Sequence, residues 1–403
     1  MSEASKSGTR KFPRPGFSRV SAAGATTSPE PYARRPLQTD LLLYAGRPGD
    51  GGVERMLVNT AYGLAERGLS VVFVTRGSKR PFLDQLGSSV RHVVLRGDQP
   101  DRELVDLLIA EKPLVAISGK IDDDQSLMAA RERAGTGTEI YFRVGNPLGF
   151  RLRAKSRTPW TKWWKRRQLT RLYQRPDGFV AVSHGISSDL RIELNVRPDR
   201  IRVLPNPVVT PSLLEHGRAV PEHDWFGENE PPVVVAVGGL RQQKDFSTLI
   251  RAFARLRRQY QCRLVIIGEG RQMNRLQSLV RELGVVADVD FPGWTSNPYP
   301  WIRSATVLAL SSLWEGFGNV IVEALALGTP VVATDCPYGP GEILQQGVYG
   351  CLVPVRDDAA MARALAETMN DLPSATELWE GAAPYTLSAS AAAYAHALGL
   401  ESE

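Results

Sequence analysis

The sequence predicts an α/β protein built from two doubly wound, Rossmann-like domains that face each other across a cleft. Three observations support this prediction. Short apolar runs alternate with segments of helical periodicity along most of the chain, the alternation breaks once in a proline-rich stretch, and glycine-rich turns follow strands in both halves. Alternating strands and helices indicate parallel sheets with helices on both faces, and such sheets bind ligands at the carboxyl ends of their strands.

The first domain is expected over residues 38–206. It follows a basic tail at 1–37 that is rich in Ser, Pro, Gly and Arg and is predicted to be disordered. Helical spacing is clear after the first strand, where apolar residues recur at positions 53, 56, 57, 61 and 64. The predicted strands are Leu41–Ala45, Val71–Thr75, His92–Leu95, Leu114–Ser118, Glu139–Arg143, Phe179–Val182 and Ile201–Leu204.

A linker is predicted at 207–232, because residues 205–232 contain six prolines and show no clear period. The alternation then restarts, and the second domain is expected over 233–385. A last helix is expected within 386–403, and the sequence leaves open whether it packs back onto the first domain. The predicted strands are Val233–Val237, Leu264–Ile267, Val289–Phe291, Val307–Leu310, Val331–Ala333 and Leu352–Val353.

The composition is that of a globular protein that works in a reducing compartment. Apolar residues make up 43% of the 403 residues and charged residues 23%, as in soluble domains. Every apolar run is shorter than the roughly 18 to 20 residues that cross a bilayer, and the N-terminal stretch lacks the apolar core of a secretory signal. The isolated cysteines Cys262, Cys336 and Cys351 favour core filling over a disulfide frame or a zinc site. We therefore expect a cytoplasmic protein.

The basic residues are concentrated in two segments. The tail holds seven Lys/Arg and two acids, residues 151–175 hold ten Lys/Arg and no acid, and the remainder of the chain is acidic. Residues 151–175 also carry Trp160, Trp163, Trp164 and Tyr173, a mixture typical of surfaces that bind anionic lipid headgroups. We expect an anionic membrane surface as partner and no nucleic acid. The alternatives are stacking on nucleic-acid bases and a solvated helix whose tryptophans lie in the core.

Gly46, Gly49, Gly51 and Gly52 lie between the first strand and its helix. Several glycines at such a turn let backbone N–H groups approach a phosphate or a sugar. The spacing is not G-x-G-x-x-G, and no acidic residue ends the second strand, which disfavours a dinucleotide-dependent oxidoreductase. A plain tight turn is the alternative.

Arg241 and Lys244 follow the first strand of the second half and precede a helix. They are expected to face the cleft, where a diphosphate attracts cations. A cation near a helix N-terminus is mildly unfavourable, so its presence there favours a bound anion over a solvated helix end.

The strongest candidate site is the segment from Ser311 to Ala324. Glu315 lies in a turn with two glycines, and Glu323 lies about one turn into a helix that starts near Asn319. Both carboxylates can accept hydrogen bonds from sugar or ribose hydroxyls, and the N–H groups at the helix start can bind phosphate. Because the residues around Glu323 are apolar, an unpaired carboxylate there would be costly, which favours a functional role over a surface charge.

The segment from Glu315 to Thr334, E-G-F-G-N-V-I-V-E-A-L-A-L-G-T-P-V-V-A-T, resembles the E-x7-E segment of retaining glycosyltransferases with the GT-B architecture, in particular glycosyltransferase family 4. The likeness extends over most of residues 40–400. Its other matches are G-G-V-E-R at 51–55, V-S-H-G-I at 182–186, L-P-N-P at 204–207, Q-K-D-F at 243–246, F-P-G-W at 291–294 with N-P at 297–298, and D-C-P-Y-G-P at 335–340.

The resemblance implies a role for each matched residue. Glu315 would hold the donor sugar, Lys244 would neutralise the diphosphate leaving group with help from Arg241, and Glu323 would hold the ribose hydroxyls. Electrostatic stabilisation of the departing phosphate would then be the main catalytic effect. The other donor-binding positions would be Gly51, Gly52, Gly293, Trp294, Phe317, Gly318 and Asn319.

On the acceptor side the resemblance points to Arg143, Asn146 and His184.

The chain departs from the family pattern at three places. Gly239 and Gly341 stand where relatives usually carry arginine, and the loop at 143–147 lacks the histidine that many members place there. A lost charge-assisted phosphate contact of about 1.5–3 kcal/mol would slow such an enzyme without abolishing catalysis.

The resemblance implies transfer of a hexose or N-acetylhexosamine, with anomeric retention, from a nucleotide sugar to a lipid-linked or polysaccharide acceptor in surface polysaccharide or lipopolysaccharide biosynthesis. A UDP-sugar is the expected donor, and no metal or other cofactor is expected. The enzyme would sit on the inner face of the cytoplasmic membrane. The alternatives are a catalytically weakened GT-B protein that binds a saccharide or a partner, and a nucleotide-sugar epimerase.

Asp122–Asp124 are expected to cap, in solvent, a helix that starts at Gln125, and not to bind a metal.

Overall fold

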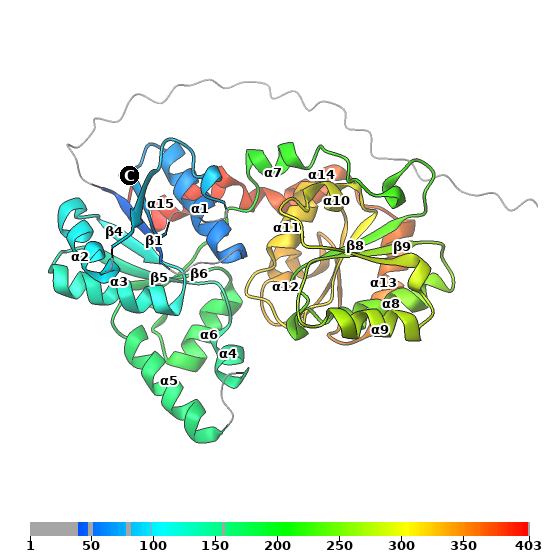
Figure 1. The fold of residues 1–403 in the computed structure, drawn as a ribbon, viewed down its shortest axis with the longest axis horizontal. Helices are drawn as coiled ribbons and strands as arrows, with labels where there is room; N and C mark the ends of the chain where they lie inside the picture. Colours follow the sequence, from blue (N-terminus) through cyan, green and yellow to red (C-terminus); the bar gives the residue numbers. More distant parts are fainter. Residues whose placement is uncertain (1–38, 47–50, 78–81, 98, 155–157, 402–403) are drawn as a thin grey trace, which may run out of the picture. The chain divides into compact units, whose positions relative to one another are not determined.

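The computed structural model describes residues 39–46, 51–77, 82–97, 99–154 and 158–401. Within these residues the chain forms two parallel β-sheets, one of seven strands and one of six, with helices packed on both faces (Figure 1). The predicted fold class is thereby confirmed. The tail at 1–37 and Gly49 lie outside the described residues.

The first sheet has the strand order β3-β2-β1-β4-β5-β6-β7, and every neighbouring pair is parallel. Leu42 and Tyr44 of its central strand face one apolar core, whereas Leu41 and Leu43 face the other. A strand buried on both faces reads as a continuous apolar run, as the sequence shows here. The strands are β1 (Leu41–Ala45), β2 (Val71–Arg76), β3 (Arg91–Leu95), β4 (Val115–Ser118), β5 (Glu139–Val144), β6 (Gly178–Ala181) and β7 (Ile201–Val203).

The C-terminal helix α15 (Leu387–Ala397) packs on this first sheet domain, beside α1 (Gly52–Glu66) (Figure 1). The contact is close, because a Cβ atom added at Gly63 of α1 would lie 3.0 Å from Leu387 and 3.1 Å from Ala391. The other helices of the domain are α2 (Pro100–Glu111), α3 (Ile121–Ala134), α4 (Leu148–Ala154), α5 (Pro159–Tyr173) and α6 (His184–Leu194).

The second sheet has the order β10-β9-β8-β11-β12-β13 and is also parallel throughout. Its strands are β8 (Val233–Val237), β9 (Arg263–Ile267), β10 (Val289–Gly293), β11 (Val307–Leu310), β12 (Val331–Thr334) and β13 (Cys351–Val353). Its helices are α8 (Phe246–Arg257), α9 (Met273–Glu282), α10 (Tyr299–Ser304), α11 (Asn319–Ala326), α12 (Pro340–Ile343), α13 (Asp358–Asn370) and α14 (Ala375–Ala382).

The stretch at 207–232 contains a short helix, α7 (Pro211–His216), which is capped by Thr210, and its assignment as a linker stays a prediction. One local expectation was wrong. The aspartates at 122–124 do not precede their helix in solvent, because α3 already starts at Ile121, and Asp123 and Asp124 are 3% and 2% exposed. The carboxylate of Asp124 accepts a hydrogen bond from the Ser118 hydroxyl at 2.7 Å. Acidic residues in a first helical turn favour the helix, and here that turn is also packed into the domain.

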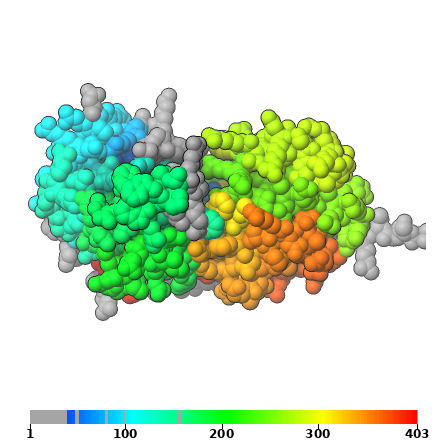
Figure 2. Space-filling model, turned by 90° about the horizontal axis from the view of Figure 1, so that it is seen from below, coloured from blue at the N-terminus to red at the C-terminus, as the bar shows by residue number. Residues whose placement is uncertain are grey.

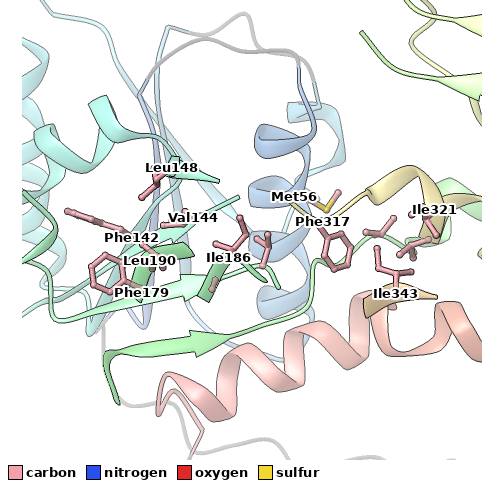
Figure 3. Close-up of a cluster of buried hydrophobic side chains, with 14 of the residues drawn as sticks. Met56, Phe142, Val144, Leu148, Phe179, Ile186, Leu190, Phe317, Ile321 and Ile343 are labelled. Carbon is pink, nitrogen blue, oxygen red and sulfur yellow. The ribbon is translucent and has the colours of Figure 1, made fainter. Parts of the chain in front are cut away.

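The two sheet domains belong to one compact unit and share an apolar core. Figure 3 shows part of it, with Met56 of α1 beside Phe317 and with Ile321 and Ile343 of the second domain further along. Phe317 is 6% exposed and also packs edge-on against Tyr385, with ring centroids 5.2 Å apart. The apolar contact holds the N-terminal ends of α1 and α11 against each other.

Candidate active site

The starts of α1 and α11 meet where the two sheet domains touch. A Cβ atom at Gly52, the first residue of α1, would lie 3.1 Å from the side-chain nitrogen of Asn319, the first residue of α11. The Asn206 side chain also donates a hydrogen bond to Asn319 at 2.8 Å. The residues before the helices, Gly51 and Gly318, offer no side-chain cap. Two helix ends with free N–H groups therefore converge from different domains, an arrangement suited to an anion.

Glu315 and Lys244 form an ion pair in the second domain. The ammonium nitrogen of Lys244 lies 2.6 Å from Oε1 of Glu315, which also accepts a hydrogen bond from the Ser312 hydroxyl at 2.6 Å. Glu315 is buried and Lys244 is partly buried. Two of the three residues predicted to be catalytic, Glu315 and Lys244, thus lie together, and the anion beside Lys244 in this structure is Glu315. Burial raises the pKa of the neighbouring Cys336 thiol to about 12, and the negative charge of Glu315 adds to the effect.

Glu323 lies on α11 and pairs with an arginine of the other domain. Nη2 of Arg55, in the first turns of α1, forms an ion pair with Oε1 of Glu323, which is 3% exposed. Nη1 of Arg55 donates a hydrogen bond to the Tyr299 hydroxyl at 2.8 Å. Burial, together with the charge of Glu323, raises the pKa of Tyr299 to about 12, and the charge of Arg55 opposes this shift. The contact explains how an apolar helix carries a buried carboxylate, and it joins the two domains.

The side chain of Arg241 lies next to Gly239, the position where relatives usually carry arginine. A Cβ atom at Gly239 would lie 3.3 Å from Nε of Arg241, so the Arg241 side chain runs past the space that a side chain at 239 would enter. At Gly341 the space is filled differently, because a Cβ atom there would lie 3.1 Å from the Gln346 side chain and 3.2 Å from a carboxylate oxygen of Asp335. A cation therefore lies near position 239, and an amide and a carboxylate lie near position 341.

Residues of the first domain predicted for the acceptor side lie against the Glu315 turn. A Cβ atom at Gly316 would lie 2.0 Å from the Gly145 carbonyl oxygen and 3.2 Å from Cα of Asn146, so the two loops touch backbone to backbone. Asn146 is exposed. Arg143, by contrast, is buried beneath this loop and donates a hydrogen bond from Nη2 to Asn206 at 2.6 Å.

His184 starts α6, and its side chain is exposed. Its backbone N–H donates a hydrogen bond to Glu342 of the second domain at 2.7 Å, and the N–H of Gly185 donates another at 2.8 Å. Ser183 caps the same helix and donates its hydroxyl to the Gly316 carbonyl at 2.9 Å. These contacts make α6 a docking point for the second domain, so the backbone of His184 has a structural role.

The two residues predicted to border the base lie at the end of β10. Gly293 has a left-handed φ of 88°, and Trp294 is 60% exposed. The backbone of Gly293 accepts a hydrogen bond from the N–H of Gly268 at 2.8 Å. An exposed tryptophan at the carboxyl end of a strand offers an apolar face on which a planar group can stack.

Sequence reasoning missed Arg55, Tyr299, Asn206 and Glu342 as members of this junction. Arg55 and Asn206 were within matched motifs, G-G-V-E-R and L-P-N-P, but a motif match gives no partner. Glu342 follows the glycine at 341 and carried no signal of its own. Within the described ranges no group of three or more His, Cys, Asp or Glu residues is placed to hold a metal ion.

Comparison with known proteins decides the family. The family model described as glycosyl transferase 4-like domain matches residues 51–207, and the one described as glycosyl transferases group 1 matches residues 231–371. A lipopolysaccharide core biosynthesis glycosyltransferase, LpsE of Rhizobium meliloti, is 30% identical over 339 residues, which is 82% of this chain and 89% of the relative. The chain belongs to the glycosyltransferases.

Solved structures agree with this glycosyltransferase in fold. Anabaena Alr3699/HepE, solved with UDP and glucose, superposes with a TM-score of 0.72 at 18% identity, over 90% of this chain and all of that one. The outer core galactosyltransferase WaaB superposes with a TM-score of 0.66 at 19% identity, over 89% of this chain and 99% of that one. The predicted GT-B architecture is confirmed. No helix in the described part of the glycosyltransferase is both long and apolar enough to cross a bilayer.

Proposed function

We propose that this glycosyltransferase transfers a hexose or N-acetylhexosamine from a nucleotide sugar, with retention at the anomeric carbon, onto a lipid-linked or polysaccharide acceptor. The observation that carries the proposal is the Lys244–Glu315 pair at the edge of the second sheet, with Glu323 one helix turn further on. A UDP-sugar is the first donor to test, since the Anabaena neighbour was solved with UDP and with UDP-glucose.

The biosynthetic setting follows from the relatives. LpsE is a core lipopolysaccharide enzyme, and a lipopolysaccharide 1,6-galactosyltransferase of Salmonella typhimurium is 32% identical over 180 residues, 43% of this chain and 47% of the relative. A Campylobacter jejuni relative that is 30% identical over 203 residues, half of this chain and 53% of the relative, acts on a diphospho-undecaprenol saccharide. We assign this chain to surface polysaccharide or lipopolysaccharide synthesis on the inner face of the cytoplasmic membrane.

The residues divide the work as follows. Glu323 accepts hydrogen bonds from the ribose hydroxyls, and Glu315 with the backbone of 317–319 holds the sugar. The bond between the anomeric carbon and the diphosphate oxygen breaks while the acceptor oxygen bonds to the same face of that carbon. The departing phosphate takes the acceptor proton. Lys244, with Arg241 three residues earlier in the same turn, stabilises the charge that grows on the phosphate in the transition state.

The helix α5 supports attachment to an anionic membrane. Trp160, Trp163 and Trp164 are 69%, 50% and 50% exposed, so they are not core residues. Trp160 and Trp163 stack on each other at 5.2 Å, and Arg167 lies over the Trp163 ring at 5.4 Å. Figure 2 shows the green surface of this region at the front of the face seen from below. Aromatic rings beside guanidinium groups suit the headgroup layer of a bilayer.

The membrane assignment is tested by flotation with vesicles that contain anionic phospholipid. Wild-type protein should float with these vesicles at moderate salt and stay behind with neutral ones. A variant with all three tryptophans changed to alanine should lose most of the bound fraction, whereas alanine at the exposed Trp379 of α14 is the control and should not. Equal flotation of the α5 variant and wild type would contradict the assignment.

A second candidate is a saccharide- or partner-binding protein with little turnover. The glycines at 239 and 341 favour it, because they remove two cations that relatives use on the phosphate side. Nucleotide binding without turnover on any acceptor would establish this candidate. Conversion of the donor sugar with no acceptor present would instead reveal an epimerase.

The donor site is tested by thermal unfolding with UDP-, GDP- and ADP-sugars and the free diphosphates. At a ligand concentration one hundred times the dissociation constant, binding to the folded state adds about 2.7 kcal/mol of stability, a readily measured shift. Glu323→Gln should weaken the binding of every nucleotide that contains ribose. If no nucleotide shifts the unfolding midpoint of the wild-type protein, the donor site is not here.

A further inference from the structure

Arg143 is a buried cation that is short of partners. It lies near the end of β5, is 3% exposed, and donates from Nη2 to the side-chain oxygen of Asn206 at 2.6 Å. Its Nε and Nη1 atoms are buried and have no hydrogen-bond partner. No carboxylate in the described part of the chain forms an ion pair with it. A guanidinium group buried in this way carries both an unneutralised charge and unsatisfied N–H groups, each of which is costly.

The surroundings of Arg143 make the positive charge still less favourable. A Cβ atom added at Gly145 would lie 3.4 Å from Nη1 of Arg143 and 3.8 Å from Val53, so the guanidinium lies near the first turn of α1. Asn206, its partner among the described residues, also donates a hydrogen bond to Asn319 at the start of α11. The two helix starts place positive dipole ends close to this cation, and neither start is capped by a side chain.

The acidic groups on the adjoining helices are already paired with other cations. Glu54 of α1 pairs with Lys120, and Glu323 of α11 pairs with Arg55. Glu315, in the turn before α11, pairs with Lys244. Among the residues that the structure describes, positive potential from Arg143 and from two helix ends therefore accumulates at the junction without a carboxylate paired to it. An anionic ligand is the simplest group to complete such a site.

We propose that Arg143 binds the diphosphate of the donor nucleotide and supplies, from the first domain, positive charge that positions 239 and 341 lack. This inference rests on the proposed function. A glycine at 145 suits this role, because Nη1 of Arg143 would lie 3.4 Å from a Cβ atom built there, so that a side chain would crowd the guanidinium group. The N–H groups of Nε and Nη1 donate to phosphate oxygens when the nucleotide is bound. Arg143 is thus a phosphate ligand and not an acceptor-side residue.

The test compares a nucleoside diphosphate with its parent nucleoside, using the pair whose diphosphate stabilises the wild-type protein. Arg143→Gln removes the charge and keeps a donor for Asn206. We expect its affinity for the diphosphate to fall about tenfold to a hundredfold, because a charge-assisted contact is lost, with the affinity for the nucleoside unchanged. Arg143→Lys should recover part of the difference. Inorganic pyrophosphate should stabilise wild-type protein and not Arg143→Gln.

A merely structural arginine would behave differently. Arg143→Gln should leave the ligand-free protein as stable as wild type or more stable, since a buried unneutralised charge is gone. Arg202→Gln, on β7, which is separated from β5 by β6 in the same sheet, is the control and should bind both ligands as wild type does. The inference is overturned if Arg143→Gln keeps the wild-type ratio of diphosphate to nucleoside affinity, or if both affinities fall together. A wild-type protein that binds no nucleoside diphosphate at all would instead overturn the donor-site proposal.

Discussion

The ion pair between Arg55 and Glu323 should be one of the strongest single contacts between the two sheet domains. The pair is largely buried, with side-chain exposures of 16% and 4%. Arg55→Met removes the charge but keeps much of the apolar stem, and it leaves the Glu323 carboxylate buried beside Tyr299. Removing one partner of a buried pair costs about 3–5 kcal/mol, and the partial exposure of Arg55 places this pair near the lower value. Glu323→Gln should cost a similar amount.

A double-mutant cycle measured by urea unfolding separates the pair from its surroundings. We expect the double variant Arg55→Met/Glu323→Gln to be more stable than the sum of the single losses predicts, by about 2 kcal/mol, because neither charge is then left alone. The exposed pair Arg197–Asp199 is the matched control, and Arg197→Met should leave the midpoint unchanged. Single losses that add within about 0.5 kcal/mol would show that Arg55 and Glu323 are not coupled.

Three further predictions concern backbone contact and the cysteines. Gly316→Ala should lower the unfolding free energy by about 1–3 kcal/mol, since its Cβ would lie 2.0 Å from the Gly145 carbonyl oxygen, and an unchanged melting temperature would contradict that close contact. In the native protein a thiol reagent at pH 8 should react with Cys351 before the other two cysteines, because burial raises the pKa of Cys262 and of Cys336 to about 12. Reaction of all three cysteines at one rate would contradict this prediction. For the same reason, the stability that these two thiols support should be fully present below about pH 9 and should decline as pH rises towards 12. The loss should be about 2 kcal/mol for each buried thiol near pH 10.5. Alanine at both cysteines should make the urea midpoint less dependent on pH over that range.

The strands could be predicted because a strand that is buried on both faces has a recognisable sequence pattern. Residues 233–237 of β8 are buried on both faces, so they read as an apolar run that is bounded by polar turns. A proline-rich stretch is harder, because prolines are also accepted in the first turn of a helix, where Pro211 starts α7. Buried acids are harder still. The aspartates at 122–124 resemble a solvated helix start, and only the position of the helix on the sheet determines that two of them are enclosed.

Only those contacts of the candidate site that lie within one domain could be predicted from the sequence. Glu315 and Lys244 were each assigned to the end of a strand in the same sheet, and parallel topology brings such ends together. The partner of Glu323 could not be found in this way, because Arg55 is on the other domain and 268 residues away. The same holds for Glu342, which meets the start of α6. Contacts between domains depend on how two finished surfaces fit, and periodicity carries no information on that.

We propose that Lys244 and Glu315 together serve the transfer of a sugar from a nucleotide. The most direct measurement is release of the nucleoside diphosphate from a panel of UDP-, GDP- and ADP-sugars, with isolated bacterial lipid-linked saccharides as acceptors. We predict that wild-type protein releases one diphosphate in step with labelling of the acceptor. Lys244→Met should lower kcat by about one to two powers of ten, with little change in KM, because the lost contact is made mainly in the transition state. A Lys244→Met variant that turns over at the wild-type rate would contradict the account.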